Sequence, residues 1–405
     1  MSEQETQALG QTKAFEPIKV GTKELSTRLV LAPLTRYRAV NDHDPSDLSL
    51  EYYTQRAQYK GSLLTTEATF ISEEAGGYPN VPGLWSDTQT KAWKKIVDSV
   101  HSKGALFNAQ LWNLGRQADP EYLSTQKLPY ISASDIYMDD ASKEKALKFN
   151  NKQRGLTKAE IKQHVEQYVK AAKNAINGAG FDFVEVHAAN GYLIDQFLQP
   201  ISNNRKDEYG GSVENRSRFL LEVVDAVCEA VGSSKVSVRL SPWGTFGSMG
   251  GQDDPNIIPT YSYVVSELEK RRRKGNELAY ISLVEPRVSG DNDTDNHVNA
   301  NNDWILLIWK GIVLRTGGFA STTPDYKRLF DTITINDRTL IGIGRYFLSN
   351  PDFITKVHDG LPLNAYNRDT FYTRGSLGYT TYPNYGEDAI SDDDPRAQRD
   401  SNTIV

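Results

Sequence analysis

The stretch LTKAEIKQHVEQYVKAAKNAINGAGFDFVEVHAANGY, residues 156–192, predicts a helix that leads directly into a buried strand. Thr157 and Glu160 stand three residues apart at its start, which is the spacing of a capping box. Apolar residues then recur at helical spacing, at Ile161, Val165, Tyr168, Ala172 and Ile176. The short apolar run FDFVEV (181–186) follows a glycine and predicts a strand.

The same alternation of strand and helix continues on both sides of this unit. Short apolar runs predict eight strands, at residues 27–33, 61–68, 105–112, 181–186, 235–242, 278–286, 311–318 and 339–345. Helices are predicted at 86–104, 156–180, 212–231, 260–274, 302–310, 323–331 and 351–358. Alternating units indicate a parallel sheet, and eight of them favour a closed (β/α)8 TIM barrel over an open doubly wound sheet.

The chain is longer than such a barrel requires. It has 405 residues, whereas a typical barrel needs about 250. Two insertions follow predicted strands, at about 113–155 and 285–302, on the face where barrel enzymes keep their active sites. We predict one domain over residues 1–405, with the barrel at about 15–385 and a mobile acidic tail at 386–405.

The composition argues against several classes of protein. A formal net charge of −6 provides no basic surface for nucleic acid, and no run of 18 apolar residues predicts a membrane span. The single cysteine, Cys228, lies in an apolar helical stripe and indicates a core thiol in a reducing compartment. The six histidines lack metal-ligand spacing, so we expect no metal. Residues 1–10 lack the apolar segment of a secretory signal, and we therefore expect a cytoplasmic location.

Polar residues stand where the predicted strands end. In chain order they are Thr35, Glu67 with Ala68, Gln110, the group His187/Asn190/Tyr192, Arg239, Glu285, Gly317 with Gly318, and Gly344 with Arg345. Each residue alone could be a satisfied loop anchor. Because the carboxyl ends of barrel strands share one face, the whole set instead indicates an active site.

The chemistry of these residues suits a flavin mononucleotide. Glycines after the last two strands allow an anion to approach the backbone, and Arg345 adds a forked cation for a phosphate. Gln110 can both donate to and accept from a heterocycle, and Arg239 suits a ring that gains negative charge on reduction. The G-x-G-x-x-G fingerprint is absent, so a Rossmann domain is not expected.

Longer motifs make the chain resemble the Old Yellow Enzyme family of flavin-dependent ene-reductases, especially its yeast and fungal branch. The most specific pair is HAANGYLIDQFL followed by DEYGGSVENR, and further matches include LAPLTRYRA, TTEATFISEEAGGYPNVPG, AQLWNLGR, VRLSPWG and LIGIGRYFLSNPDF. The resemblance runs from about residue 15 to 385. It implies an FMN-containing barrel that uses NADPH to reduce the C=C bond of an enone or enal, and a possible homodimer.

The resemblance also implies a role for each site residue. Contacts to the flavin ring are implied for Pro33, Leu34, Thr35, Ala68, Gln110 and Arg239. Phosphate contacts are implied for Gly317, Gly318, Gly344 and Arg345. His187 and Asn190 would bind the acceptor's carbonyl oxygen, and Tyr192 would donate the proton. We expect the apolar walls of the substrate cavity at Trp112, Phe246 and Tyr372.

The sequence departs from the family pattern in three places. Gly318 stands where yeast-type enzymes often have asparagine, Trp243 where tyrosine is common, and the loop at 286–303 is strongly polar. This loop is expected to border the cavity, so substrate preference is left open.

Two other readings remain open at this stage. Carboxylates at the strand exits, Glu67, Glu185 and Glu285, could serve a glycoside hydrolase. A flavin-binding barrel without turnover is the other alternative.

Overall fold

The computed structural model describes residues 7–290, 292–294 and 300–405. Its centre is a closed barrel of eight parallel strands, each within two or three residues of a predicted one. They are β3 (Leu29–Leu31), β4 (Leu63–Thr65), β6 (Leu106–Trp112), β9 (Phe183–Ala188), β10 (Val236–Leu240), β11 (Tyr280–Val284), β14 (Val313–Thr316) and β15 (Thr339–Ile343). Pairing of β15 with β3 and of β4 with β6 completes the ring, which confirms the predicted TIM barrel.

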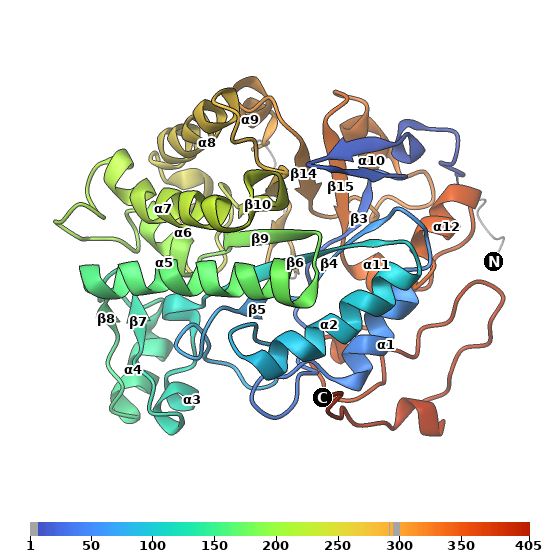
Figure 1. Ribbon diagram of the computed structural model, residues 1–405, viewed down its shortest axis with the longest axis horizontal. Coiled ribbons are helices and arrows are strands. Elements are labelled where there is room, and N and C mark those ends of the chain that lie inside the picture. The colour runs from blue at the N-terminus through green and yellow to red at the C-terminus, as the bar shows by residue number, and fades with distance from the viewer. Residues whose placement is uncertain (1–6, 291, 295–299) are drawn as a thin grey trace.

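Helices cover the outside of the barrel (Figure 1). The helices predicted from the sequence are α2 (Asp87–Ser102), α5 (Lys158–Lys173), α7 (Val213–Val231), α8 (Ile257–Arg273), α9 (Asp303–Ile308), α10 (Lys327–Ile333) and α12 (Phe353–Asp359). The predicted capping box of Thr157 with Glu160 is confirmed, and Ser86 with Gln89 forms another at the start of α2. Helix α5 continues as the π-helical turn η3 (Asn174–Ala179), which ends at Gly180.

Helix α1 (Asp47–Arg56) is absent from the sequence-based prediction. Its buried face includes Ser49 and Arg56 beside two tyrosines, so the helix shows no clear apolar stripe. Arg56 is tolerated there because it donates to the backbone carbonyls of Tyr52, Leu348 and Tyr379. The short helices α6 (Leu193–Leu198) and α11 (Arg345–Leu348) were also not predicted.

The amino-terminal end of the barrel is sealed by the antiparallel hairpin of β1 (Ile18–Val20) and β2 (Lys23–Leu25). Its apolar residues pack in one cluster with the first residues of the barrel strands, including Leu63, Phe183 and Leu340. A ligand can therefore enter only from the opposite end, where the strands end and the βα loops begin.

The predicted insertion after β6 is folded rather than irregular. It contains η2 (Gly115–Gln117), α3 (Pro120–Thr125), β7 (Ile131–Ser132), α4 (Asp140–Lys148) and β8 (Arg154–Gly155), and it lies at the lower left of Figure 1.

The other short elements are β5 (Thr69–Phe70), β12 (Val288–Ser289), β13 (Asn292–Asp293), η1 (Lys13–Phe15), η4 (Ser233–Lys235), η5 (Gly251–Asp253), η6 (Arg368–Thr370) and η7 (Pro395–Ala397).

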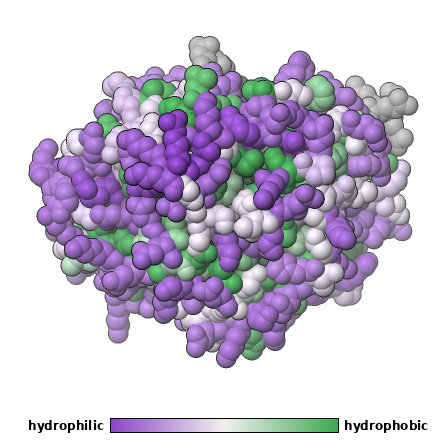
Figure 2. All heavy atoms as spheres, turned by 45° about the horizontal axis from the view of Figure 1, so that its top comes forward, coloured by the Kyte–Doolittle hydropathy of each residue, from purple (hydrophilic) through white to green (hydrophobic). Residues whose placement is uncertain are grey.

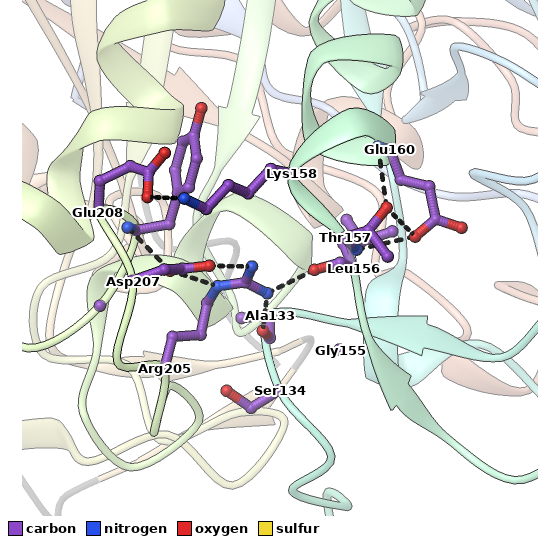
Figure 3. A network of polar contacts seen from close by, with 12 residues as sticks. Ala133, Ser134, Gly155, Leu156, Thr157, Lys158, Glu160, Arg205, Asp207 and Glu208 are labelled. Atoms are coloured by element: carbon purple, nitrogen blue, oxygen red, sulfur yellow. Dashed lines mark hydrogen bonds and ion pairs between the residues drawn. The ribbon is translucent and has the colours of Figure 1, made fainter.

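Arg205 connects this insertion to the barrel (Figure 3). It lies two residues before the motif DEYGGSVENR, which starts at Asp207. Its guanidinium donates to the carbonyls of Ala133, at 2.9 Å, and Leu156, at 2.6 Å, and pairs with Asp207 at 2.7 Å. Lys158, at the start of α5, pairs with Glu208 at 2.5 Å. These contacts therefore hold the βα loop after β6 and the βα loop after β9 together.

The acidic tail at 386–405 makes specific contacts with α1. The amide of Asp47 donates to the carbonyl of Asn402 at 2.9 Å, and Arg399 pairs with Glu51 at 2.6 Å. Figure 1 shows the tail running beside α1 and α2. Its mobility stays a prediction, and these contacts argue against it for the last residues.

The surface seen in Figure 2 is mostly hydrophilic, with hydrophobic residues scattered between charged ones. In the part of the chain that the structure describes, no helix is both long and apolar enough to cross a membrane. Cys228 is half-buried, and burial raises the pKa of its thiol to about 12, so it is unreactive at neutral pH.

Candidate active site

One cavity lies at the carboxyl ends of the barrel strands, and many of the predicted site residues line it. These are Pro33, Leu34, Thr35, Asn190, Arg239, Gly317, Gly318, Gly344, Arg345 and Tyr372. Thr35 follows β3, Arg239 belongs to β10, and the glycines follow β14 and β15. The barrel therefore brings together residues that lie far apart in the sequence, from Pro33 to Tyr372.

The glycines after β14 form a cradle, and Gly317 leaves no room for a side chain. A Cβ atom at Gly317 would lie 2.7 Å from Val288 and 2.8 Å from Glu285. Gly318 has φ 64°, in the left-handed region that favours glycine. Arg328 donates to the Gly317 carbonyl at 2.9 Å, and because the peptide is trans, the Gly318 amide points away from Arg328. None of the described residues accepts a hydrogen bond from that amide.

Arg345 supplies the cation at the same end of the cavity. Its guanidinium pairs with Asp293 of β13, at 2.7 Å and 3.2 Å, and lies over the ring of Tyr366. A guanidinium that forms a forked pair with a carboxylate can form the same pair with a phosphate. The free backbone amide of Gly318 and an arginine therefore fit a phosphate group here.

Arg239 lies at the other end of the cavity, deep in the barrel. It is 6 % exposed, and its Nε is buried without a hydrogen-bond partner among the described residues. Burial lowers its pKa, and the carboxyl of Glu185 opposes that shift. An unpaired buried N–H costs about 1–3 kcal/mol, so it favours a ligand that accepts a hydrogen bond.

Gln110 and Ala68 lie beside this cavity rather than among the residues that line it. Gln110 Nε2 donates to Glu185 Oε1 at 2.7 Å, so one of its donors is already engaged. Ala68 packs against Trp112 in a separate apolar cluster. Contacts of these two residues with a flavin ring stay predictions.

His187 is the last residue but one of strand β9, and its ring has a defined tautomer. Its Nδ1 accepts a hydrogen bond from the amide of Ala189 at 3.3 Å, so a neutral ring carries its proton on Nε2. Burial, with a smaller contribution from the charge of Arg239, lowers the pKa of His187 well below its ordinary value. At neutral pH His187 is therefore an uncharged donor.

Asn190 and Gly191 form a left-handed turn between His187 and Tyr192, with φ 56° and 69°. The backbone amide of Asn190 donates to Ser241 Oγ at 2.7 Å, and the backbone carbonyl of Asn190 accepts from Gln117 Nε2 at 2.6 Å. Ser241 and Gln117 were not among the site residues predicted from the sequence. Ser241 was detectable as a polar residue at the exit of a predicted strand.

Tyr192 follows this turn and packs among aromatic rings. Its ring meets those of Trp112 and His187 edge to face, with centroids 4.8 Å and 4.9 Å apart, and Phe246 lies at 6.3 Å. Burial, with smaller contributions from Tyr78 and other nearby tyrosines, raises the pKa of Tyr192 well above 10. The phenol therefore keeps its proton at neutral pH, beside the His187 and Asn190 donors.

The family described as "NADH:flavin oxidoreductase / NADH oxidase family" matches residues 13–364 of this chain. The chain belongs to this family. Enoate reductase 1 of Kluyveromyces lactis is 48% identical over 390 residues, which cover 95% of this chain and 96% of that protein. A probable NADPH dehydrogenase of Candida albicans is 46% identical and covers 92% of this chain and 91% of its own length.

A solved structure gives the same result. Old Yellow Enzyme from Pichia sp. AKU4542 has a TM-score of 0.93 and 46% identity, with 98% of this chain and 100% of that chain covered. The resemblance to the Old Yellow Enzyme family is therefore confirmed. The chain is an oxidoreductase with FMN as cofactor.

Of the departures from the family pattern, Trp243 and the loop at 286–303 differ in how they lie relative to the cavity. Trp243 lies outside the cavity, where its Nε1 donates to the carbonyl of Asn301 at 2.9 Å. In the loop at 286–303, Val288 and Gly290 line the cavity, as expected. Residues 291 and 295–299 of that loop lie outside the described residues.

The carboxylates at the strand exits do not form a hydrolytic pair. Glu285 is held by Arg315 at 2.8 Å and 3.0 Å, and Glu67 accepts from the amide of Arg36 at 3.0 Å. Each is bound in a different network, which disfavours a shared role in glycoside hydrolysis. Among the described residues, no group of three or more histidine, cysteine or acidic side chains could hold a metal ion.

Proposed function

We propose that this protein uses NADPH and FMN to reduce the activated C=C bond of α,β-unsaturated carbonyl compounds. The observation that carries the proposal is the edge-to-face packing of Tyr192 on His187, with centroids 4.9 Å apart, two residues after Asn190, which lines the same cavity as Thr35 and Arg239. FMN, when bound, would supply the hydride-carrier chemistry that links NADPH to the β-carbon of the acceptor. The remaining steps belong to side chains of this protein.

His187 and Asn190 would hold the carbonyl oxygen of the acceptor. As the β-carbon gains hydride, negative charge moves onto that oxygen, and two fixed N–H donors stabilise it. His187 is suited to this role because its Nε2 carries the proton in the neutral tautomer. Asn190 lines the cavity, and both backbone groups of this residue are held by other side chains.

Tyr192 would protonate the α-carbon. A phenol with a pKa well above 10 holds its proton at neutral pH and releases it only to a strongly basic carbon. Trp112, Phe246 and Tyr372 would form the apolar walls around the acceptor. The expected cytoplasmic location, the expected homodimer and the single domain stay predictions.

The visible spectrum of the purified protein tests this function directly. We expect a flavin absorption band that bleaches when NADPH is added without oxygen and recovers when cyclohexenone follows. Bleaching without recovery would contradict the roles of His187, Asn190 and Tyr192. A protein that holds no flavin, even after reconstitution, would contradict the whole proposal.

Thr35 is expected to affect one half of the reaction. A hydroxyl bonded to a ring carbonyl stabilises the electron-rich reduced ring, so Thr35→Ala should slow reduction by NADPH about fivefold, the effect of one neutral hydrogen bond. Reoxidation by the enone should not slow. Stopped-flow absorbance separates the two steps, and Thr35→Ser is the control that keeps the hydroxyl. Equal reduction rates in all three proteins would refute this role.

A further inference from the structure

Asp195 is a buried carboxylate to which the proposed reaction gives no role. It lies in α6, three residues after Tyr192, and is 1 % exposed. Its Oδ2 accepts from the amide of Gly191 at 2.8 Å. Its Oδ1 accepts from the hydroxyl of Tyr261 and from Gln199 Nε2, the latter at 3.2 Å. Both oxygens are therefore engaged, and one of them holds the turn that precedes Tyr192.

The turn of Asn190 and Gly191 is held by side chains from several elements. Gln196 Nε2 donates to the Gly191 carbonyl at 2.7 Å, while Ser241 and Gln117 bind the backbone of Asn190. A non-glycine residue in the left-handed region costs about 1–3 kcal/mol, so such a turn persists only when its surroundings fix it. Of the four side chains that fix it, only Asp195 can change its charge near neutral pH.

Asp195 also connects this turn with the loop that carries Phe246. Gln199, which donates to Asp195, accepts from the amide of Gly250 at 3.1 Å. The carbonyl oxygen of Phe246 lies 2.7 Å from the position that a Cβ of Gly191 would take. A movement of Gly191 would therefore displace both the proton donor and one expected wall of the substrate cavity.

We propose that Asp195 is a positioning residue for proton delivery, and that only its ionised form holds Gly191 and Tyr192 in the productive geometry. This inference rests on the proposed function, because it assumes that Tyr192 delivers a proton to the acceptor. Protonation would turn one carboxylate oxygen into a donor and remove the negative charge that attracts the Gly191 amide. The turn would then lose the charge-assisted hydrogen bond from the Gly191 amide to Asp195.

The groups that face Asp195 place this change in an accessible pH range. Burial raises the pKa of Asp195 to about 6, opposed by hydrogen bonds from Tyr261, Gly191 and Gln199 and by the charge of Arg116. Behind these groups, Asp254 acts on Tyr261, and Tyr130 and Asp139 act on Arg116. Tyr192 and His187 do not titrate there, since their pKa values lie well above 10 and well below 6.5.

The test is the pH dependence of reoxidation of the reduced holoenzyme by cyclohexenone, followed in a stopped-flow spectrometer. With one group titrating near pH 6, the rate should be about tenfold lower at about pH 5 than at about pH 8. In Asp195→Asn, the side chain is uncharged at every pH and does not titrate. Its rate should vary by less than about twofold over the same range.

Tyr261→Phe is a second variant that leaves Asp195 in place. It removes a hydrogen bond that lowers the pKa of Asp195, so the midpoint of the pH profile should move to higher pH. Glu67 is a second buried carboxyl that could cause a loss of rate at low pH, because burial raises its pKa to about 7. If Asp195 is the titrating group, the loss of rate at low pH should persist in Glu67→Gln.

The inference would be overturned if the reoxidation rate of Asp195→Asn still fell at low pH. It would also be overturned if the midpoint of the pH profile did not move in Tyr261→Phe. A wild-type rate that is flat between about pH 5 and pH 8 would overturn it as well. Failure of the proposed function looks different. In that case the enone would not reoxidise the flavin at any pH, and reduction by NADPH would be unaffected.

Discussion

Replacing Tyr192 with phenylalanine is expected to slow reoxidation by an enone about 10²–10⁴-fold, the usual contribution of a positioned general acid. The ring would remain between Trp112, His187 and Phe246, because its edge-to-face contacts do not involve the hydroxyl. Only the proton source would be lost. Reduction of the flavin by NADPH should keep its wild-type rate, since that half of the reaction requires no proton from Tyr192.

Stopped-flow absorbance measures both halves in one preparation. Tyr346→Phe is a matched control, because Tyr346 lines the same cavity but has no place in the proton-delivery cluster. Its reoxidation rate should stay within about twofold of wild type, as expected for a change that removes no transition-state contact. Reoxidation by Tyr192→Phe at the wild-type rate would show that the α-carbon takes its proton from another source, such as water.

The pH dependence gives a further check on Tyr192. Burial holds the pKa of its phenol well above 10, so the protonated donor is fully populated up to at least about pH 9. Proton delivery should therefore not weaken as the pH rises through neutrality. A loss of reoxidation between about pH 7 and pH 9 in the wild-type protein would mean that a different group acts as the acid.

The barrel could be predicted because its signals are local. Each barrel strand is a short, nearly continuous apolar run, since both faces of a parallel strand are buried. The helices start at side chains that can cap them, such as Ser86 and Thr157. Helix α1 was not predicted because its buried face carries Arg56. This arginine donates to the carbonyls of Leu348 and Tyr379, about 300 residues away in the sequence.

The candidate site could be predicted in part, because the strand exits meet on one face. Motifs placed Thr35, Arg239 and the glycines in positions where the structure gives them a common cavity. The supporting contacts could not be predicted. Gln117 reaches the carbonyl of Asn190 across 73 residues, and Arg345 pairs with Asp293 across 52. Such contacts depend on how loops pack, and no local pattern encodes them.

The loop at 286–303 shows why substrate preference stays beyond the sequence. The loop was expected to border the cavity, and Val288 and Gly290 do line it, but its polar composition did not indicate that Asp293 binds Arg345. Asp293 lies where it would repel a phosphate unless it moves or shares the guanidinium. The composition of a loop therefore does not reveal which of its few residues face the ligand.

Removing the hydrogen-bond donor of His187 is expected to lower kcat/KM for the enone about 10²–10³-fold, the usual cost of losing one donor to a developing oxyanion. His187 also packs, because its ring meets Tyr192 edge to face and stacks on Trp112 with centroids 6.3 Å apart. A change to alanine would mix both effects. Two variants separate them: His187→Phe keeps an aromatic ring without a donor, and His187→Gln keeps an N–H donor without a ring.

If the donor matters, His187→Phe should lose most of the activity. The kcat/KM of His187→Gln should then be about tenfold or more above that of His187→Phe, because a hydrogen bond to a charged oxygen is restored. Flavin absorbance and reduction by NADPH should be the same in both, which controls for folding and cofactor binding. The opposite order, with phenylalanine active and glutamine inactive, would mean that His187 supports Tyr192 by packing alone. Asn190 would then be the single donor to the acceptor oxygen, and its loss would carry the larger effect.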